Sequence, residues 1–372
     1  MNAPKLRFKE FNDEWISQKL FQLVEFSKGN ILAKADLDET GIYPCILYGQ
    51  LYTKYNEVIR EIYSKTNRNE NKIPKSKKGD VLIPSSGETP IDISTSSCIQ
   101  IDNVLLGGDI NILRPISCDG RFLSYLINNN KKTEIAKVAQ GHSVVHLYND
   151  NLKQVSINIP SIQEQKRISD TLELLDKKIE LQSKKIEDLK LFKLSKYSSV
   201  FSKTNNKIKL SDICIIEKGK QINSDMLIEK GNYYMLNGGI LPSGYLNEYN
   251  TNENTITISE GGNSCGYVNF NKTKFWCGGH CYKIISPSVN TFYLYHLLKY
   301  NEKKIMDLRV GSGLPNIQKK DLKALKLSIN KNDEQLKIGI LFDTFDKKIN
   351  LETNKLDKLQ KLKKGLMQRM FV

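Results

Sequence analysis

An internal duplication most constrains what this chain can fold into. Sliding the sequence against itself by 170 residues aligns 141–201 with 311–371 without a gap, and 16 of these 61 positions are identical. The heptamers LDKKIEL (175–181) and FDKKINL (345–351) are part of this match. Further upstream, 19–30 is similar to 209–220 at a spacing of 190, so the middle of the second copy is shorter by twenty residues. The chain is therefore predicted to form two related halves with similar ends and divergent middles.

The repeated end of each copy has the spacing of a long helix. Apolar residues recur in steps of four and three, as in a coiled-coil seam. They are Ile168, Leu172, Leu175, Ile179, Ile186 and Leu189 in the first copy, and Ile338, Phe342, Phe345, Ile349, Leu356 and Leu359 in the second. Gln182 and Glu352 place a polar residue at the same seam position. A helix of about 35 residues is expected in each copy, paired antiparallel, with Asp-Lys-Lys facing a partner or solvent. A general rod or a dimerisation coil is the structural alternative.

The helix starts carry capping signals. Ser161 and Glu164 predict a capping box for the first helix, and Asn332 or Asp333 is expected to cap the second.

The middles have the pattern of mixed α/β domains. Short β-like runs (80–83 and 255–258) alternate with loops rich in Gly, Ser and Asn, and helical stretches at 122–132 and 292–304 close each middle. The predicted fold is α+β, with two α/β domains in tandem pseudo-twofold repeat separated by two long antiparallel helices. The boundaries are a first domain at 1–160, a first helix at 161–201, a linker at 202–209, a second domain at 210–330 and a second helix at 331–372.

The charge favours a polyanionic partner. The formal net charge is +15, and one local cluster comprises Lys65, Arg68, Lys72, Lys75, Lys77 and Lys78. A solvated basic surface is the alternative explanation. Seven cysteines without a paired framework suit a reducing compartment, and the charged N-terminus does not have the pattern of a signal peptide. A soluble cytoplasmic protein is expected.

Catalytic motifs are missing from the sequence. There is no GxxxxGK[ST] loop, no dinucleotide fingerprint and no Pro-Pro dipeptide, so the Asn/Asp-Pro-Pro-aromatic motif of amino-methyltransferases is absent. Cys277-Gly-Gly-His280-Cys281 has zinc-ligand chemistry but lacks a second Cys/His pair, and Leu106–Ile110 of the first copy keeps only the Gly-Gly. A structural turn is the favoured interpretation, and no metal site is predicted.

Two similar but non-identical domains on a basic, non-catalytic chain suit the reading of a two-part, asymmetric DNA site. Lys and Arg would supply phosphate contacts, and polar side chains would contact base edges. The helices would set the half-site distance at about one DNA turn, ~34 Å. A stand-alone nuclease or methyltransferase, and a coiled-coil scaffold that never touches DNA, are the alternatives.

Three segments resemble the specificity subunit of type I restriction–modification systems: PKLRFKEFNDEW (4–15), IPSIQEQKRI (159–168) followed by LDKKI (175–179), and LQKLKKGLMQRMF (359–371). The resemblance implies two target recognition domains around two antiparallel helices. It also implies partners: two modification subunits that carry S-adenosylmethionine and methylate adenine, and ATP-driven, Mg-dependent restriction subunits. The chain itself would bind none of these cofactors. A specificity subunit of a fused restriction–methylation enzyme is a close alternative. The second copy has Ile329-Asn-Lys-Asn332 where the family usually shows a proline, so its helix is expected to start differently.

Candidate DNA-binding residues are polar side chains of the predicted loops, for which an ordinary surface turn is the alternative. They are Ser85, Ser86, Glu88, Thr89, Gln140 and His142 in the first copy, Asn237, Asn263, Ser264, Ser312 and Asn316 in the second, and Lys28, Lys218 and Arg309 for phosphate.

Overall fold

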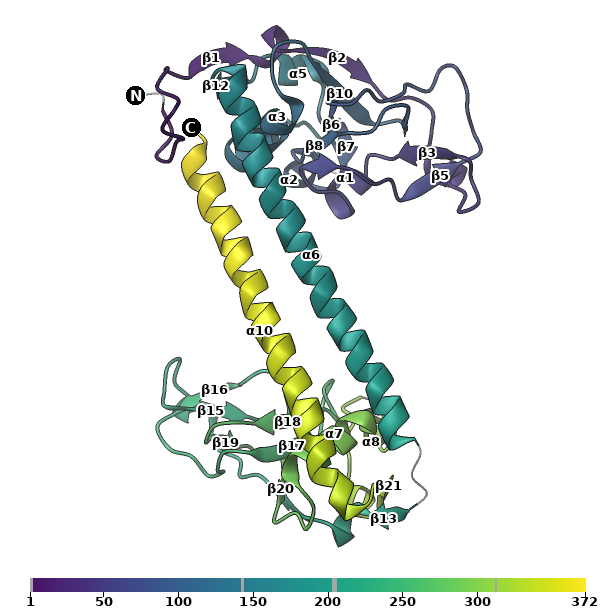
Figure 1. Cartoon of the computed structure of the whole chain (residues 1–372), viewed down its shortest axis with the longest axis vertical. Coiled ribbons are helices and arrows are strands. Elements are labelled where there is room, and N and C mark those ends of the chain that lie inside the picture. The colour runs from purple at the N-terminus through teal and green to yellow at the C-terminus, as the bar shows by residue number, and fades with distance from the viewer. Residues whose placement is uncertain (1–2, 142–143, 203–205, 312) are drawn as a thin grey trace. The chain divides into compact units, whose positions relative to one another are not determined.

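The computed structural model describes residues 3–141, 144–202, 206–311 and 313–372, and the chain divides into two compact units. Unit 1 comprises Met1–Gln182 with Lys355–Val372, and unit 2 comprises Ser183–Asn354. Helices α6 (Ile162–Phe201) and α10 (Asn332–Met370) each contribute one stretch to either unit (Figure 1). Each unit also holds the sheets of one copy of the repeat.

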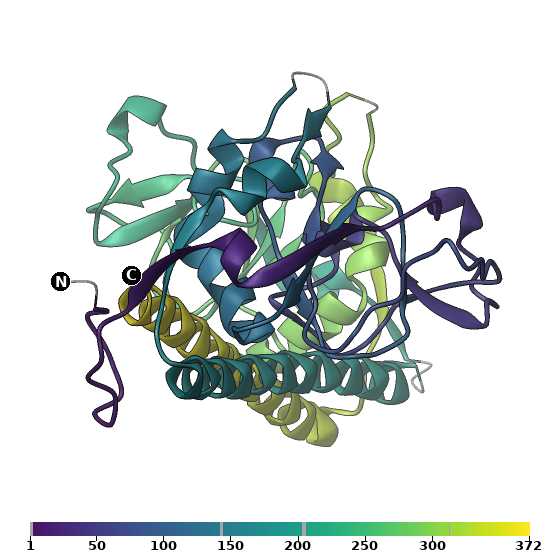
Figure 2. The same cartoon turned by 90° about the horizontal axis from the view of Figure 1, so that it is seen from above.

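Unit 1 is built on a five-stranded sheet in the order β2-β10-β6-β8-β4. The strands are β2 (Val24–Lys28), β10 (Ile110–Pro115), β6 (Val81–Pro84), β8 (Ser97–Ile99) and β4 (Val58–Ile59). All four residues of β6 are buried, and helix α3 (Gly120–Leu126) contacts β6 and β8. The largest core cluster joins Trp15 and Phe122 to residues from α6 and from the C-terminal end of the chain. Leu6 N also donates to Arg369 O at 2.8 Å, so both chain ends lie together in this unit (Figure 2).

Smaller sheets complete unit 1. A three-stranded sheet has the order β5 (Ser64–Thr66), β3 (Tyr43–Ile46), β9 (Leu105–Leu106), and β1 (Ile16–Lys19) pairs with β12 (Ser156–Ile159). Strand β7 (Ser86–Gly87) pairs with β11 (Val145–His146). Short helices are α1 (Gln50–Thr53), α2 (Pro90–Ile93), α4 (Lys132–Lys137) and α5 (Asn149–Lys153), with a π-helical turn at Ile127–Lys131 between α3 and α4.

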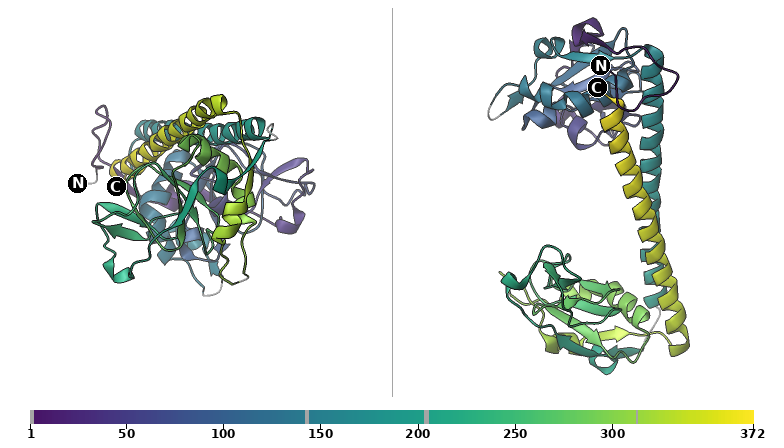
Figure 3. Two further views of the ribbon diagram at one scale, coloured as in Figure 1. Left: turned by 90° about the horizontal axis from the view of Figure 1, so that it is seen from below. Right: turned by 90° about the vertical axis from the view of Figure 1, so that its left-hand side faces the viewer.

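Unit 2 is built on a four-stranded sheet in the order β14-β20-β17-β18. Its strands are β14 (Ile215–Lys218), β20 (Cys281–Ile285), β17 (Thr255–Ser259) and β18 (Val268–Asn271). Helix α7 (Thr291–Tyr300) packs against β17 and β18 (Figure 3, right). The other elements are β16 (Gly244–Leu246), β15 (Tyr233–Leu236) and β19 (Trp276–Cys277) in a three-stranded sheet, β13 (Lys207–Lys209) paired with β21 (Lys326–Ser328), α8 (Glu302–Met306) and α9 (Lys319–Ala324). β13 occupies the end of the segment expected to be a linker.

The strand registers show that the repeat extends through the middles that differ in sequence. In unit 1, Asn111 of β10 pairs with Lys28 of β2 on one side and with Ile83 of β6 on the other. In unit 2, Tyr282 pairs with Lys218 and Ile258 in the same way. The β-like runs at 80–83 and 255–258 are therefore equivalent strands, and the expected α+β fold is confirmed.

The two long helices are confirmed, and they are 40 and 39 residues long. Contrary to expectation, both begin at the same place in the repeat, since Ile162 and Asn332 are equivalent. A glutamine in the first turn of each helix makes the same hydrogen bond to the segment before the helix. Gln165 Nε2 donates to Pro160 O at 2.8 Å, and the equivalent Gln335 Nε2 donates to Asn330 O at 3.1 Å.

The predicted caps are only partly correct. Ser161 Oγ accepts from Glu164 N at 3.4 Å, but the Glu164 carboxylate is taken by Arg7, whose Nε and Nη2 both donate at 2.7 Å. Asn332 and Asp333 lie inside the first turn of α10 and do not precede it.

The helices run antiparallel within each unit. In unit 1, Lys363 Nζ lies 2.7 Å from Asp176 Oδ1. In unit 2, Lys185 bonds Glu352, Lys193 bonds Asp346, and the ring of Tyr197 lies 4.4 Å from that of Phe342, so numbers rise on α6 as they fall on α10. The expectation that Asp-Lys-Lys faces outward is therefore wrong for the aspartates. Asp176 and Asp346 are half-buried in ion pairs, and the lysines after them are exposed.

Among the described residues, no helix is both long enough and apolar enough to cross a membrane.

Candidate nucleic-acid interface

Several predicted contact residues of unit 1 meet where β2 and β6 end. Lys28 is the last residue of β2, and Ser86 in β7 pairs with His146 in β11. His146 and Gln140 exchange two backbone hydrogen bonds, of 2.7 and 2.9 Å, and Leu147 N donates to Ser85 O at 2.9 Å. Loops from three parts of the sequence are thereby held together at one end of the sheet.

An exposed tyrosine, which the sequence reasoning missed, lies in this cluster. Lys28 Nζ sits 5.6 Å from the centre of the Tyr148 ring, and that ring stacks on His146 at 6.1 Å. The Tyr148 side chain is 45 % exposed. An aromatic face beside a cation is a combination that serves both stacking and phosphate binding.

Unit 2 has the same backbone arrangement. The backbone of Asn316 forms antiparallel β-bridges with Val310 and with Gly261. In unit 1, the backbone of His146 pairs in the same way with Gln140 and with Ser86. Ile317 N donates to Glu260 O at 2.8 Å, which makes Glu260 the equivalent of Ser85. Asn316 and His146 are 170 residues apart, so the spacing of the repeat could have identified this pair of positions.

Glu260 organises the end of the unit 2 sheet and was also missed from the sequence. Its Oε1 accepts from Lys218 Nζ at 2.7 Å and from the Tyr282 hydroxyl at 2.9 Å, and its Oε2 lies 3.9 Å from His280 Nδ1. Burial and the neighbouring Glu260 carboxylate raise the pKa of Tyr282, which keeps its hydroxyl a donor. Glu260 therefore pairs with Lys218, a predicted phosphate contact whose side chain is 51 % exposed.

A glycine follows each of these lysines because the backbone there touches another loop. A Cβ on Gly29 would lie 1.8 Å from Gly107 O, and one on Gly219 would lie 2.2 Å from Gly278 O. No side chain fits at such distances. The contact locks the end of β2 or β14 onto the Gly-Gly segment that both copies share.

The remaining predicted residues lie in different settings. Ser85 and Ser86 are buried at 6 % and 5 % exposure, and Thr89 caps α2 by accepting from Asp92 N at 3.2 Å. Asn237 Oδ1 accepts from His280 N at 3.0 Å, and Arg309 Nε donates to Met306 O at 2.7 Å. The residues that offer exposed side chains are Lys28, Glu88, Thr89, Gln140, Lys218, Asn263, Arg309 and Asn316, while Ser264 is half-buried. His142 and Ser312 lie outside the described residues.

The cysteines around His280 are part of the protein interior. Cys277 and Cys281 are buried, and Cys277 Sγ lies 3.8 Å from Cys281 O. The contact with Cys281, together with burial, raises the pKa of Cys277. Within the ranges that the structure describes, no three His, Cys, Asp or Glu side chains are placed to hold a metal ion.

The sequence profile of the family described as "Type I restriction modification DNA specificity domain" matches residues 12–191 and again 202–361. The chain therefore belongs to this family, which confirms the resemblance.

Individual relatives agree with this assignment. The chain is 32 % identical over 166 residues to a type I specificity subunit of Mycoplasma pneumoniae, a match that covers 44 % of each chain. It is 23 % identical to the specificity subunit of the MjaX type I restriction enzyme of Methanocaldococcus jannaschii, over 98 % of this chain and 95 % of that protein. The crystal structure of the type I restriction–modification S subunit from M. genitalium has the same fold. Its TM-score is 0.77 at 21 % identity, over 100 % of this chain and 99 % of that chain.

Proposed function

We propose that this chain reads a two-part, asymmetric DNA sequence and directs adenine methylation and ATP-dependent restriction by partner subunits to it. One observation carries the proposal: two units with the same strand register present different side chains at equivalent positions. His146 and Tyr148 of unit 1 are replaced by Asn316 and Gln318 in unit 2. Two units with the same backbone arrangement but different exposed side chains can each recognise a different half-site.

Positions that carry the same residue in both units have a different role in this proposal from positions that differ between the units. Lys28 and Lys218 occupy equivalent strand ends and would contact phosphates, which contributes affinity without sequence preference. The exposed polar side chains beside them, such as Gln140, Asn263 and Asn316, would contact base edges.

The helices would serve the partners. Leu181 and Leu351 occupy the same position of the repeat, and they are 57 % and 55 % exposed. A repeated apolar side chain suits a partner that docks twice, in keeping with two modification subunits. These subunits would carry S-adenosylmethionine, and restriction subunits would use ATP and Mg, all in the cytoplasm. The helices would set a half-site separation of about one DNA turn, ~34 Å.

Mapping adenine methylation across the host genome before and after deletion of the gene tests this function. Loss of methylation at one interrupted, asymmetric motif is the expected result. Methylation of DNA by the purified chain without partners would favour the stand-alone enzyme. Failure to bind duplex DNA even with a modification subunit present would favour the scaffold.

Single substitutions then test the assignment of the two half-sites. Gln140→Ala should relax one base of one half-site, and Asn263→Ala should relax one base of the other, so each variant is the control for its counterpart. Lys28→Ala should weaken binding to all sequences alike and reduce the slope of log K against log salt by about 0.9. If Gln140→Ala and Asn263→Ala both leave target and affinity unchanged, the base contacts lie elsewhere.

A further inference from the structure

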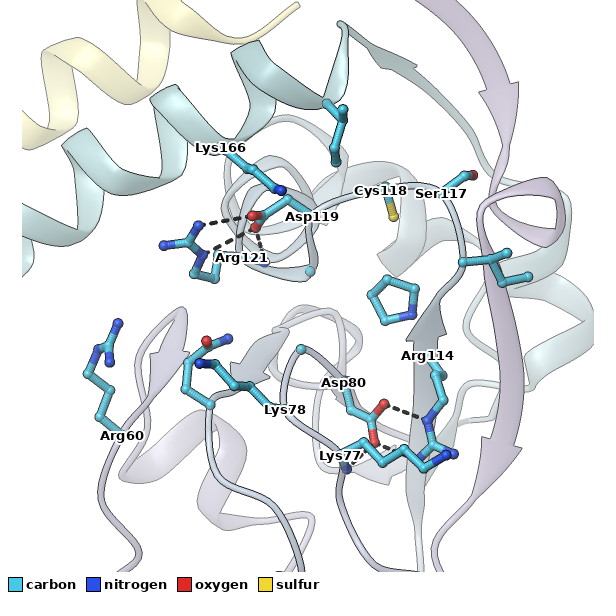
Figure 4. Close-up of a pocket in the computed structure, with 16 residues that line it drawn as sticks. Arg60, Lys77, Lys78, Asp80, Arg114, Ser117, Cys118, Asp119, Arg121 and Lys166 are labelled. Atoms are coloured by element: carbon cyan, nitrogen blue, oxygen red, sulfur yellow. Dashed lines mark hydrogen bonds and ion pairs between the residues drawn. The ribbon is translucent and has the colours of Figure 1, made fainter.

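A basic pocket of about 1000 Å³ opens in unit 1, away from the proposed base contacts. It is lined by residues just before β6 and just after β10, whereas Ser85 follows the other end of β6. Since β6 and β10 are antiparallel, the pocket and the proposed DNA contacts lie at opposite ends of the same two strands. The lining includes six cationic side chains (Arg60, Lys77, Lys78, Arg114, Arg121 and Lys166) and two acidic ones (Asp80 and Asp119), shown in Figure 4.

The arginines of the pocket are already engaged by carboxylates. Arg114 binds Asp80 with two hydrogen bonds of 2.8 Å. Arg121 donates to Asp119 at 2.9 Å and to two carboxylates of α6. Arg60 pairs with Glu173, which also belongs to α6. The planar forks that would bind a carboxylate ligand are therefore largely occupied from within the protein.

The lysines of the pocket are different. Among the described residues, the side chains of Lys77, Lys78 and Lys166 form no ion pair, and they enter the pocket from the loop before β6 and from α6 (Figure 4). Lysine is a compact, mobile point charge that binds phosphate oxygens without needing a planar partner. Three free ammonium groups in a wide pocket therefore favour an anion that carries several phosphate oxygens over a carboxylate group.

At the equivalent described positions, unit 2 carries different side chains from those of this pocket. Because Val81 is equivalent to Ile256, the positions of Lys77 and Lys78 are taken by Asn252 and Glu253, and the backbone agrees, since Gly79 and Asn254 both have positive φ. The other positions follow from the strand registers, the helix caps and the repeat spacing. Arg114 becomes Ile285, Arg121 becomes Phe292 and Lys166 becomes Leu336. A partner that makes the same contact with both units could not use these residues, because only unit 1 carries them.

We infer that this pocket is a binding site for phosphate groups, used once per chain and separate from the reading of bases. The ligand is either a free polyphosphate such as a nucleotide or the phosphate backbone of a nucleic-acid strand. This inference goes beyond the proposed function and does not depend on it.

Tripolyphosphate binding to the full chain, measured by calorimetry, tests the site. Replacing Lys77, Lys78 and Lys166 together by alanine should raise Kd at least about tenfold, equivalent to about 1.4 kcal/mol. The matched control replaces Lys177, Lys178 and Lys184, three exposed lysines of α6 that do not line the pocket, and should leave Kd unchanged. Replacing the three pocket lysines by arginine should retain binding, which separates loss of charge from loss of structure.

A duplex of random sequence distinguishes the two phosphate sources. If the ligand is the nucleic-acid backbone, the alanine variant should reduce the slope of log K against log salt by about 2.7. If the ligand is a free polyphosphate, this slope should stay unchanged while tripolyphosphate binding is lost. Equal tripolyphosphate binding by the native chain and the pocket variant, or none by the native chain, would overturn the inference. If the alanine variant loses binding to a partner subunit but still binds tripolyphosphate like the native chain, the ligand is an acidic protein surface and the inference is overturned. Methylation mapping is independent of all these results.

Discussion

Lowering the pH from 7 to 5 should destabilise unit 2 through one buried histidine, His296 on α7. Its side chain is 1 % exposed, and its Nδ1 lies 2.7 Å from the Tyr197 hydroxyl and 4.0 Å from Asp346 Oδ2. That carboxylate is bound by Lys193, so its charge does little to favour a protonated imidazole. Burial, and then repulsion from Lys193, lower the pKa of His296 to about 3.

The sign and size of the effect follow from proton linkage. In the unfolded chain His296 takes up a proton near its ordinary pKa of 6.5, whereas in the folded protein it stays neutral down to about pH 3. Its contribution is therefore complete above pH 6.5 and is lost as the pH falls through the window between these values. The free energy of unfolding should drop by about 1.4 kcal/mol per pH unit well inside this window, and by about 2 kcal/mol between pH 7 and pH 5.

Urea unfolding followed by tryptophan fluorescence can isolate this unit. The chain has two tryptophans, Trp15 in unit 1 and Trp276 in unit 2, so Trp15→Phe leaves Trp276 as the only reporter. In the Trp15→Phe background, the free energy of unfolding is compared at pH 7 and pH 5. His296→Gln should make the difference between these two values smaller by about 2 kcal/mol. Glutamine keeps a polar partner for Tyr197, which limits other changes.

The matched control is His280→Gln, which removes a 63 % exposed histidine of the same unit and should leave the pH dependence intact. If His296→Gln retains the full native pH dependence, or if the control removes it, the reasoning from burial is refuted.

Two further changes test the packing that positions the proposed DNA contacts. Gly219→Ala should destabilise unit 2 by about 1–3 kcal/mol in urea unfolding, because its Cβ would lie 2.2 Å from a backbone oxygen. Gly365→Ala, in open space on α10, should instead stabilise unit 1 by up to about 1 kcal/mol, and equal effects would contradict the argument. Lys363→Met should cost about 1–3 kcal/mol because it removes the cation that pairs with both Asp176 and Glu57, while Asp176 keeps the hydrogen bond from the Tyr125 hydroxyl. Lys347→Met, which removes a lysine whose side chain is 70 % exposed, should change the free energy of unfolding by less than about 1 kcal/mol, as read from thermal or urea unfolding.

The features that the sequence predicted correctly are those that follow from a regular spacing of apolar residues or from the repeat itself. The steps of four and three predicted both long helices, and the repeat of 170 residues predicted two equivalent halves. The β-like run before Ser85 was found because its apolar residues are consecutive, and the run before Glu260 because threonine and isoleucine alternate in it. A helical seam or a buried strand can be recognised from neighbouring residues alone, since each has its own period.

The members of the candidate interface could not be identified in the same way. Ser85 and Ser86 have the composition of a surface loop, yet the pairing with β11 buries them. Glu260 and Tyr148 carried no local signal, because their importance comes from partners distant in sequence. Burial and charge pairing depend on which segments meet, and a loop sequence does not contain that information.

By itself, the sequence determined that this chain is a tandem repeat with a long amphipathic helix at the end of each copy. Only the tertiary structure decided that each helix ends in the core of the other copy's unit. Phe371, from the second copy, packs 5.4 Å from Phe122 in unit 1, and the equivalent Phe201, from the first copy, packs 5.9 Å from Tyr293 in unit 2. The reason is that an apolar residue at a helix end specifies that it will be buried but not against which partner. The antiparallel course of the helices within each unit selects that partner.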